Sequence, residues 1–262
     1  MAERTFLGNV RLWLLLAVLV FVALGAWLDR SRSRDWNDTL RITVYPITQT
    51  ADPSVVAYAR GLQAADFATV EEFFADESTD FGVQLEQPVR IRVSQAARTA
   101  PPVLPRQPSM LDAIVWSLRT RWYAAKVAWD DPLPTPDIQV FALYLPLARN
   151  SSPMPDSVGL SKGLIAVAHL YGHPDAAGSN AVVITHEVLH TLGATDKYDL
   201  ASGQPLAPAG LGEPGRAPMY PQEFGEIMAG RIATGPSTSM IAGSLDDMLV
   251  GPETAAEIGW AR

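Results

Sequence analysis

Two histidines and a glutamate stand in a spacing suited to metal chemistry. His186, Glu187 and His190 form the run HEVLH. Residues four apart lie on one face of a helix, so both imidazoles can point at one metal ion. Neutral imidazole is a favoured zinc ligand. Glu187 would lie beside the metal rather than on it, where its carboxylate can take a proton from a water molecule.

The residues that follow extend this pattern to a third ligand. Gly193 can adopt a left-handed conformation and end the helix abruptly. The chain can then turn back, so that Asp196 reaches the metal. A turn or capping role is the alternative for Asp196, because aspartate is favoured in turns. The predicted cofactor is therefore one zinc ion held by His186, His190 and Asp196, with Glu187 as the catalytic base.

The run HEVLHTLGATD resembles the zinc motif of the metzincins, HExxHxxGxxH or HExxHxxGxxD. This resemblance implies a zinc peptidase with a twisted mixed sheet and an active-site helix. The next residues, Lys197-Tyr198-Asp199, are similar to the D-x-Y-D run of the immune-inhibitor-A-like secreted metallopeptidases. Asp199 is expected to be a solvated loop charge. Support of a ligand or calcium binding are its alternatives, and nothing else in the sequence supports a Ca²⁺ site.

A methionine turn beneath the zinc ligands is a second feature of that family. Gly225 to Gly230 (GEIMAG) resembles it, with Met228 as the methionine. An ordinary core methionine is the alternative, because methionine fills core gaps readily. Three other methionines compete for the role: Met219, Met240 and Met248. The segment GPETAAEIGW resembles the helix that closes metzincin domains.

Three further residues are candidates for contacts near the metal. Some metzincins place a tyrosine ligand two residues after the turn methionine, where this chain has Gly230. Tyr198 or Tyr220 could substitute for it in stabilising the tetrahedral intermediate. His169 lies in a strand-like run along which the resemblance would lay the substrate. It is more simply a half-buried strand residue.

The elements that must position these residues follow from hydrophobic periodicity. The predicted strands cover 40–47, 89–93, 138–147 and 163–171. The predicted helices cover 53–74, 110–129, 180–192 and 252–259, and Ser179 or Asn180 can cap the third. Proline and glycine make 200–221 a long loop, expected to shape the cleft together with strand 163–171. The order predicts an α/β (α+β) domain over 40–262 with a loop-rich C-terminal part.

The predicted helix 110–129 is amphipathic. Its apolar positions, expected to face the core, are Leu111, Ile114, Val115, Leu118, Trp122 and Val127.

An uncharged apolar run at residues 12–28 predicts a membrane-spanning helix. As a helix it reaches about 26 Å, enough for a bilayer core. Trp13 and Trp27 lie at its ends, where indoles favour the lipid interface. A cleaved signal peptide is the alternative, with a weak site at Ala23 to Gly25. An uncleaved anchor explains both the length and the tryptophans.

With that anchor, residues 1–11 form a cytoplasmic tail and 29–39 a linker. The domain would face the periplasm or exterior of a bacterial inner membrane, although the arginines after the segment argue for the opposite orientation.

Composition excludes several classes of function. The net charge is −8 and no Lys/Arg-rich run lies outside the membrane flanks, which argues against a nucleic-acid partner. The absence of cysteine excludes disulfides and thiolate sites. The expected function is a membrane-anchored endopeptidase acting on peptide or protein substrates. The alternatives are a gluzincin-like enzyme with Glu223 or Glu226 as third ligand, and a catalytically idle membrane-tethered zinc-binding domain.

Overall fold

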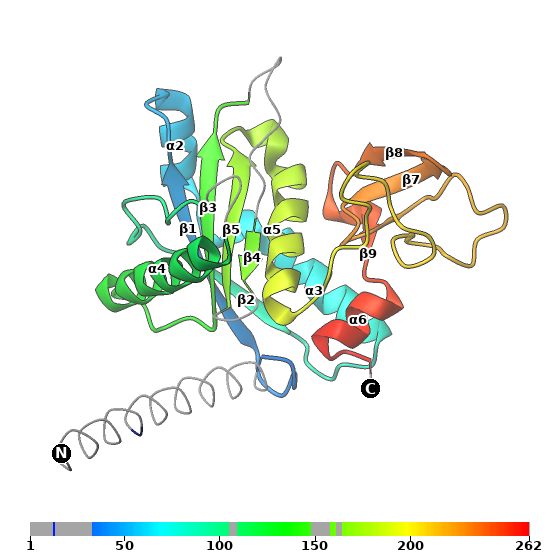
Figure 1. The fold of residues 1–262 in the computed structure, drawn as a ribbon, viewed down its shortest axis with the longest axis horizontal. Coiled ribbons are helices and arrows are strands. Elements are labelled where there is room, and N and C mark those ends of the chain that lie inside the picture. The colour runs from blue at the N-terminus through cyan, green and yellow to red at the C-terminus, as the bar shows by residue number, and fades with distance from the viewer. Residues whose placement is uncertain (1–12, 14–32, 105–108, 148–157, 161–163, 262) are drawn as a thin grey trace, which may run out of the picture.

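The computed structural model describes Trp13 and residues 33–104, 109–147, 158–160 and 164–261. This part of the chain is a mixed α/β structure with two sheets (Figure 1). The main sheet has the strand order β2-β1-β3-β5-β4. Its strands are β1 (Leu40–Thr48), β2 (Val89–Val93), β3 (Ile138–Leu145), β4 (Val158–Leu160) and β5 (Ile165–Tyr171). All pair in parallel except β4, which is antiparallel to β5, so the expected mixed sheet is confirmed.

Helices cover both faces of the main sheet. Alternate residues of a strand point to opposite faces. One face, with Val44 and Val140, packs in the larger core. The other, with Tyr45 and Phe141, packs in a smaller one. The helices of the larger core are α2 (Pro53–Gly61), α3 (Ala68–Asp80), α5 (Ala177–Leu192) and α6 (Pro252–Ile258). The smaller core is covered by α4 (Met110–Asp130).

The expectation of one helix over 53–74 is wrong, because two helices cover this region. The first ends at Gly61, and Leu62 is extended with φ −63° and ψ 136°. The carboxylate of Asp66 then accepts a hydrogen bond of 2.7 Å from the main-chain nitrogen of Gln63. This capping contact begins a short 3-10 turn, Ala64–Phe67, which leads into α3. A local side-chain bond therefore restarts the helix at a point that apolar periodicity does not reveal.

Helix α4 forms where expected, but the prediction of its buried face is wrong. Thr120, Ala124 and Val127 are its buried residues. Of the predicted core positions only Val127 is among them. The other five, Leu111, Ile114, Val115, Leu118 and Trp122, are exposed. Tight packing on Tyr45 and Phe141 selects the face with small side chains instead.

The C-terminal part contains a second sheet that sequence patterns did not predict. Its strands lie in the order β8-β7-β6-β9. They are β6 (Gly225–Glu226), β7 (Arg231–Gly235), β8 (Thr238–Ile241) and β9 (Met248–Leu249). Such short strands carry too few residues for a clear alternation. The predicted last helix is present as α6.

Residues 33–39, expected to be a linker, pack against this C-terminal end. Trp36 is buried, and its indole Nε1 donates a hydrogen bond of 2.8 Å to the carbonyl oxygen of Ile258. Its ring lies 5.5 Å from that of Trp260. Gly259 ends α6 with φ 87°, and a Cβ there would lie 2.4 Å from the carbonyl oxygen of Arg34. The two ends of the described domain therefore meet.

Of the predicted membrane segment 12–28, only Trp13 is described, and it is helical and exposed. The rest of that segment and the predicted tail, 1–11, lie outside the described residues. Among the described residues, no helix combines the length and the apolar character needed to cross a membrane.

Candidate metal centre

Helix α5 carries the two histidines and is fixed at both ends. It begins at Ala177, directly after the 3-10 turn Pro174–Ala176. The expected cap by Ser179 or Asn180 is therefore wrong. The amide of Asn180 instead accepts a hydrogen bond of 3.0 Å from the nitrogen of Tyr171 and donates one of 2.8 Å to its carbonyl oxygen. These two bonds tie the first turn of α5 to the end of β5.

The face of α5 that lies away from the metal ligands is buried in the larger core. Ile184, Val188, Leu189 and Leu192 are all at most 1% exposed. Rigid backing of this kind holds the ligand side chains in place.

The helix ends where Gly193 reverses the chain. Gly193 has φ 106° and ψ 7°, a left-handed conformation that favours glycine. Its nitrogen donates to the carbonyl of His190 at 3.1 Å, and the nitrogen of Ala194 donates to that of Leu189 at 3.0 Å. These bonds close the last turn of the helix. Three residues after Gly193, Asp196 returns to the histidines.

Main-chain carbonyls orient both imidazoles. Nδ1 of His186 lies 3.0 Å from the carbonyl oxygen of Ile227, and Nδ1 of His190 lies 2.9 Å from that of Ala194. A carbonyl oxygen only accepts, so each Nδ1 is the donor. In a neutral ring, Nε2 is then left with its lone pair, which is the form that binds a metal.

The three predicted ligands converge on one point. Nε2 of His186 and of His190 lie 3.3 and 3.0 Å from Oδ1 of Asp196. All three ligand atoms lie within 4.8 Å of one another. In a tetrahedral centre with bonds of about 2.0–2.2 Å, neighbouring ligand atoms are about 3.4 Å apart. The separations fit a zinc ion, and imidazole and carboxylate are donors that zinc accepts.

Electrostatics at the cluster also favour a cation. Oδ1 of Asp196 is buried and has no hydrogen-bond donor. Burial alone would raise the pKa of Asp196, but contacts with His186 and His190 outweigh it and hold the pKa well below its usual range. Burial would lower the pKa of His190, and its contacts with Asp196 and Ala194 raise it overall. A positive charge shared between these side chains, as a proton or as a metal ion, is therefore stabilised.

Glu187 provides a buried carboxylate beside this cluster. Glu187 is 4% exposed, and its Oε2 has no hydrogen-bond partner. Burial raises the pKa of Glu187 to about 7, and the positive charge of His186 and His190 opposes that rise. A carboxylate that titrates near neutral pH can both accept and return a proton.

The turn at Met228 supports the cluster from the C-terminal part. Met228 is fully buried, whereas its rivals Met219 and Met240 are exposed and Met248 lies in β9. Its carbonyl oxygen accepts a hydrogen bond of 3.0 Å from the nitrogen of Lys197, next to Asp196. The preceding carbonyl, that of Ile227, holds His186. One turn therefore binds the main chain beside Asp196 and the ring of His186.

Glu226 holds this turn in place. Its buried carboxylate accepts hydrogen bonds from the nitrogens of Met228 and Ala229 at 2.6 and 3.0 Å. It also accepts from the nitrogen of Gly251 at 3.3 Å and the hydroxyl of Thr254 at 2.6 Å. Burial raises the pKa of Glu226, and these hydrogen bonds oppose the rise. The carboxylate thus connects the turn to the start of α6.

A second contact with α6 fixes the loop that carries Asp196. Glu257 accepts hydrogen bonds from the nitrogen and hydroxyl of Thr195, at 2.9 and 2.6 Å. It also accepts one from the buried ammonium of Lys197 at 2.9 Å. Asp196 therefore lies between two residues that are both bound to Glu257.

Sequence reasoning missed Glu226, Lys197 and Glu257 as supports of the site. The sequence indicates Lys197 only as part of a resemblance, and Glu226 only as an alternative ligand. Their contacts with α6 join segments 25 to 62 residues apart, so no local spacing could reveal them.

The other candidate residues lie outside the three-residue cluster. His169 is half-buried in β5, opposite Leu143 of β3. Strand β5 is not the sheet edge, which β4 forms. Tyr198 bridges to Pro205, and Tyr220 is half-buried in the following loop. Asp199 is exposed, and its carboxylate accepts from the nitrogen and hydroxyl of Ser202 at 2.8 and 2.7 Å.

The two glutamates considered as third ligands have other partners. Glu226 accepts the four hydrogen bonds described above. Glu223 is largely exposed and lies 3.3 Å from a guanidinium nitrogen of Arg216. Among the described residues, His186, His190 and Asp196 are the group arranged to hold a metal.

No family model matches this chain, and no curated protein matches it.

Proposed function

We propose that this chain is a membrane-anchored, zinc-dependent endopeptidase of the metzincin type. The observation that supports it most is the convergence of His186, His190 and Asp196 beside the buried carboxylate of Glu187. The carbonyl-oriented imidazoles, the chain reversal at Gly193 and the turn at Met228 add to this support. A purely structural metal site has no need of a base such as Glu187.

The roles of the residues follow from their positions. A zinc ion held by His186, His190 and Asp196 would lower the pKa of a bound water to about 7 and polarise the scissile carbonyl. Glu187 accepts the proton of the attacking water and passes it to the leaving amine. The carbonyls of Ile227 and Ala194 keep the imidazoles in the ligating tautomer.

Strand β4 is the proposed docking site for an extended substrate. It is the outer strand of the sheet, antiparallel to β5, and it contacts α5. An edge strand offers main-chain donors and acceptors to a peptide that adds to the sheet. A peptide bound there would run beside the helix that carries the metal ligands. The loop over 200–221 would form the other side of the cleft.

The predicted anchor at 12–28 completes the proposal. It would hold the catalytic domain at the membrane, facing the periplasm or exterior of a bacterial cell. The burial of Ser33 and Trp36 means that the domain begins within a few residues of this segment.

The test combines metal analysis with a peptide cleavage screen on the full-length chain in detergent. One zinc per chain and cleavage of peptides, with cleavage lost in Glu187→Gln, support the proposal. Bound zinc without cleavage of any peptide would identify the idle binding domain. Zinc and activity that survive Asp196→Ala would instead indicate a different third ligand, such as Glu223.

A further inference from the structure

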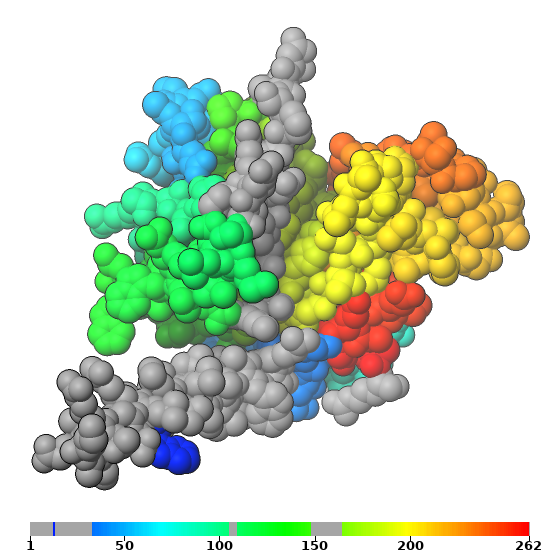
Figure 2. All heavy atoms as spheres, in the orientation of Figure 1, coloured from blue at the N-terminus to red at the C-terminus, as the bar shows by residue number. Residues whose placement is uncertain are grey.

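Helix α4 presents an apolar stripe to solvent. The stripe lies opposite the buried residues Thr120, Ala124 and Val127, and its members are 39% to 88% exposed. They are Leu111, Ile114, Val115, Leu118, Trp122 and Trp129. Their spacing of i, i+3, i+4, i+7, i+11 and i+18 places them on one side of a helix. Figure 2 shows α4, in green, at the surface facing the viewer.

Basic residues flank this stripe. With about 100° per residue, Arg119 and Lys126 lie on one side of it and Arg121 on the other. Between Ala113 and Trp129 the helix contains these three cations and no acidic residue. The whole chain, by contrast, has a net charge of −8. An apolar stripe with tryptophan, bordered by cations, is the pattern of a helix that lies in the surface of an anionic bilayer.

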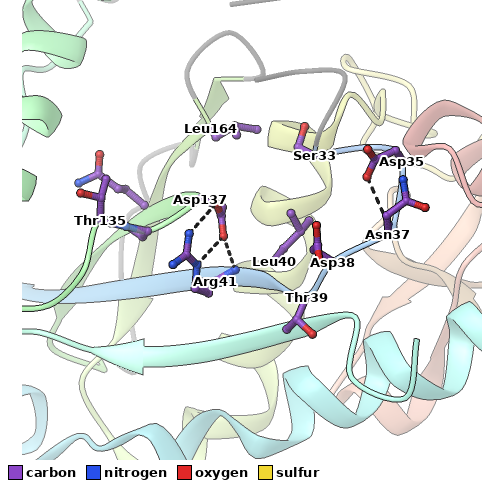
Figure 3. A pocket seen from close by; sticks show the side chains of 12 residues that line it. Ser33, Asp35, Asn37, Asp38, Thr39, Leu40, Arg41, Thr135, Asp137 and Leu164 are labelled. Carbon is purple, nitrogen blue, oxygen red and sulfur yellow. Dashed lines mark hydrogen bonds and ion pairs between the residues drawn. The ribbon is translucent and has the colours of Figure 1, made fainter. Parts of the chain in front are cut away.

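The position of α4 brings it near the predicted anchor. Ser33 is buried and only five residues after Leu28, so it can lie at most about 18 Å from the end of the segment 12–28. Ser33 lines a cavity of about 760 Å³ together with Thr135 and Asp137, as Figure 3 shows. Thr135 is five residues beyond the end of α4 at Asp130. The chain therefore reaches the domain at the end of the sheet to which α4 leads.

Hydrogen bonds beside this cavity and strand pairing hold these two segments together. The carboxylate of Asp137 accepts hydrogen bonds from the main-chain nitrogen and Nε of Arg41, at 2.8 and 3.0 Å. Strands β1 and β3 are paired in parallel from Ile42 and Ile138 to Thr48 and Tyr144. The segment that follows the predicted anchor is thus joined directly to the segment that follows α4.

We propose that the exposed stripe of α4 rests on the anionic phospholipid surface of the membrane in which residues 12–28 are anchored. The apolar side chains enter the boundary between headgroups and acyl chains, and Arg119, Arg121 and Lys126 bind lipid phosphates. The domain then has two attachments, one through the anchor and one through α4, and these fix its orientation on the bilayer. This proposal rests on the predicted anchor and does not depend on the metal centre or on peptidase activity.

Site-directed spin labelling tests this docking, because the chain has no cysteine of its own. Full-length Leu118→Cys carries a nitroxide in the stripe. Ala57→Cys, exposed on α2 across the sheet, is the matched control. Both are placed in vesicles of phosphatidylcholine with phosphatidylglycerol. The label at 118 should lose access to a water-soluble relaxant and gain access to oxygen, whereas the label at 57 should remain accessible to the water-soluble relaxant.

Two variants separate the apolar and the charged contributions. Leu111→Gln with Trp122→Gln changes exposed side chains only, and should return the label at 118 to water. Arg119→Gln, Arg121→Gln and Lys126→Gln should each weaken docking about fivefold, because a basic residue near an anionic surface contributes that much. Vesicles of phosphatidylcholine alone remove all three contributions and should weaken docking more than any one of these substitutions.

Two results would overturn the proposal. The first is a label at 118 that stays as accessible to the water-soluble relaxant as the label at 57. The second is protection that comes with spin–spin coupling between labels and disappears on dilution with unlabelled chain, which would identify a second copy as the occupant.

Discussion

Nζ of Lys197 lies 2.9 Å from Oε2 of Glu257, a residue 60 positions later in the chain. Thr195 donates hydrogen bonds to the same carboxylate, so Glu257 is bonded to the chain on both sides of Asp196. The third candidate ligand is thus held by α6, an element that contributes no ligand itself. Partners of this kind orient metal ligands and affect metal affinity.

Loss of the hydrogen bonds to Glu257 should weaken metal binding. Glu257→Ala is expected to lower zinc affinity about 10–100-fold, with turnover preserved at saturating zinc. Glu253→Ala, an exposed residue on the same helix, is the control and should change neither quantity. Competition with a fluorescent chelator measures the affinity. Equal affinities for the two variants would exclude a positioning role for Glu257.

Removal of the base should separate metal binding from catalysis. Glu187→Gln keeps the shape of the side chain and should retain zinc and fold, while turnover falls about 10²–10⁴-fold. Metal content, thermal unfolding and peptide cleavage are measured on the same sample. Wild-type turnover in this variant would contradict the proposed mechanism.

Asp196 should be necessary for zinc and replaceable by histidine. Asp196→Ala is expected to lose most zinc, because a catalytic zinc site has three protein ligands. Asp196→His should restore much of it, since imidazole also binds zinc. Asp199→Ala is the matched control, since that carboxylate caps Ser202. Its zinc content should stay near that of the wild type, and full zinc in Asp196→Ala would place the ligand elsewhere.

Met228 should act through packing. Met228→Leu, close in volume, should cost less than about 1.5 kcal/mol of the free energy of unfolding. Met228→Ala should cost about 2–5 kcal/mol, because a cavity would remain beneath the site. Met240→Leu, at an exposed position, should have little effect. Chemical denaturation measures the free energy of unfolding of the three variants. If Met228→Leu kept full stability but lost most of its zinc, the sulfur of Met228 would instead be a ligand.

Because of Glu77, the free energy of unfolding should fall as the pH rises. Burial raises its pKa to about 7, although its carboxylate accepts a hydrogen bond of 2.6 Å from the nitrogen of Val250. The folded state therefore holds a proton that the unfolded chain releases near pH 4.5, and this stabilisation is lost between about pH 4.5 and 7.

Comparison of Glu77→Gln with the wild type measures this effect. Between pH 4.5 and 8, the free energy of unfolding of Glu77→Gln should rise relative to that of the wild type by on the order of 1 kcal/mol. Partial solvent exposure of Glu77 reduces this value. Asp76→Asn, at an exposed position on the same helix, is the control. A constant difference between Glu77→Gln and the wild type across this range would show that Glu77 is not buried as described.

The candidate site could be predicted because its chemistry is encoded locally. The i, i+4 histidines and Gly193 lie within eight residues on one helix and its end, where spacing determines direction. The long strands β1 and β3 and the helix α4 were also predictable from periodicity.

The remaining features depend on contacts between distant segments. Periodicity predicts α4 as a helix, but the small side chains Ala124 and Val127 select the packed face. The contacts of Glu226 with Gly251 and of Glu257 with Thr195 join residues 25 and 62 positions apart. Strands such as β6 and β9 have two residues each, too few to show a pattern.

The contact between Trp36 and α6 has a mechanical consequence. Trp36 donates a hydrogen bond to the carbonyl of Ile258, and the neighbouring Glu257 accepts hydrogen bonds from Thr195 and Lys197. If residues 12–28 anchor the chain as proposed, a force applied through them would act on the contact between Trp36 and α6, and through Glu257 on the loop of Asp196. Tension on the proposed anchor and the geometry of the proposed third ligand would thus be coupled through a single short helix.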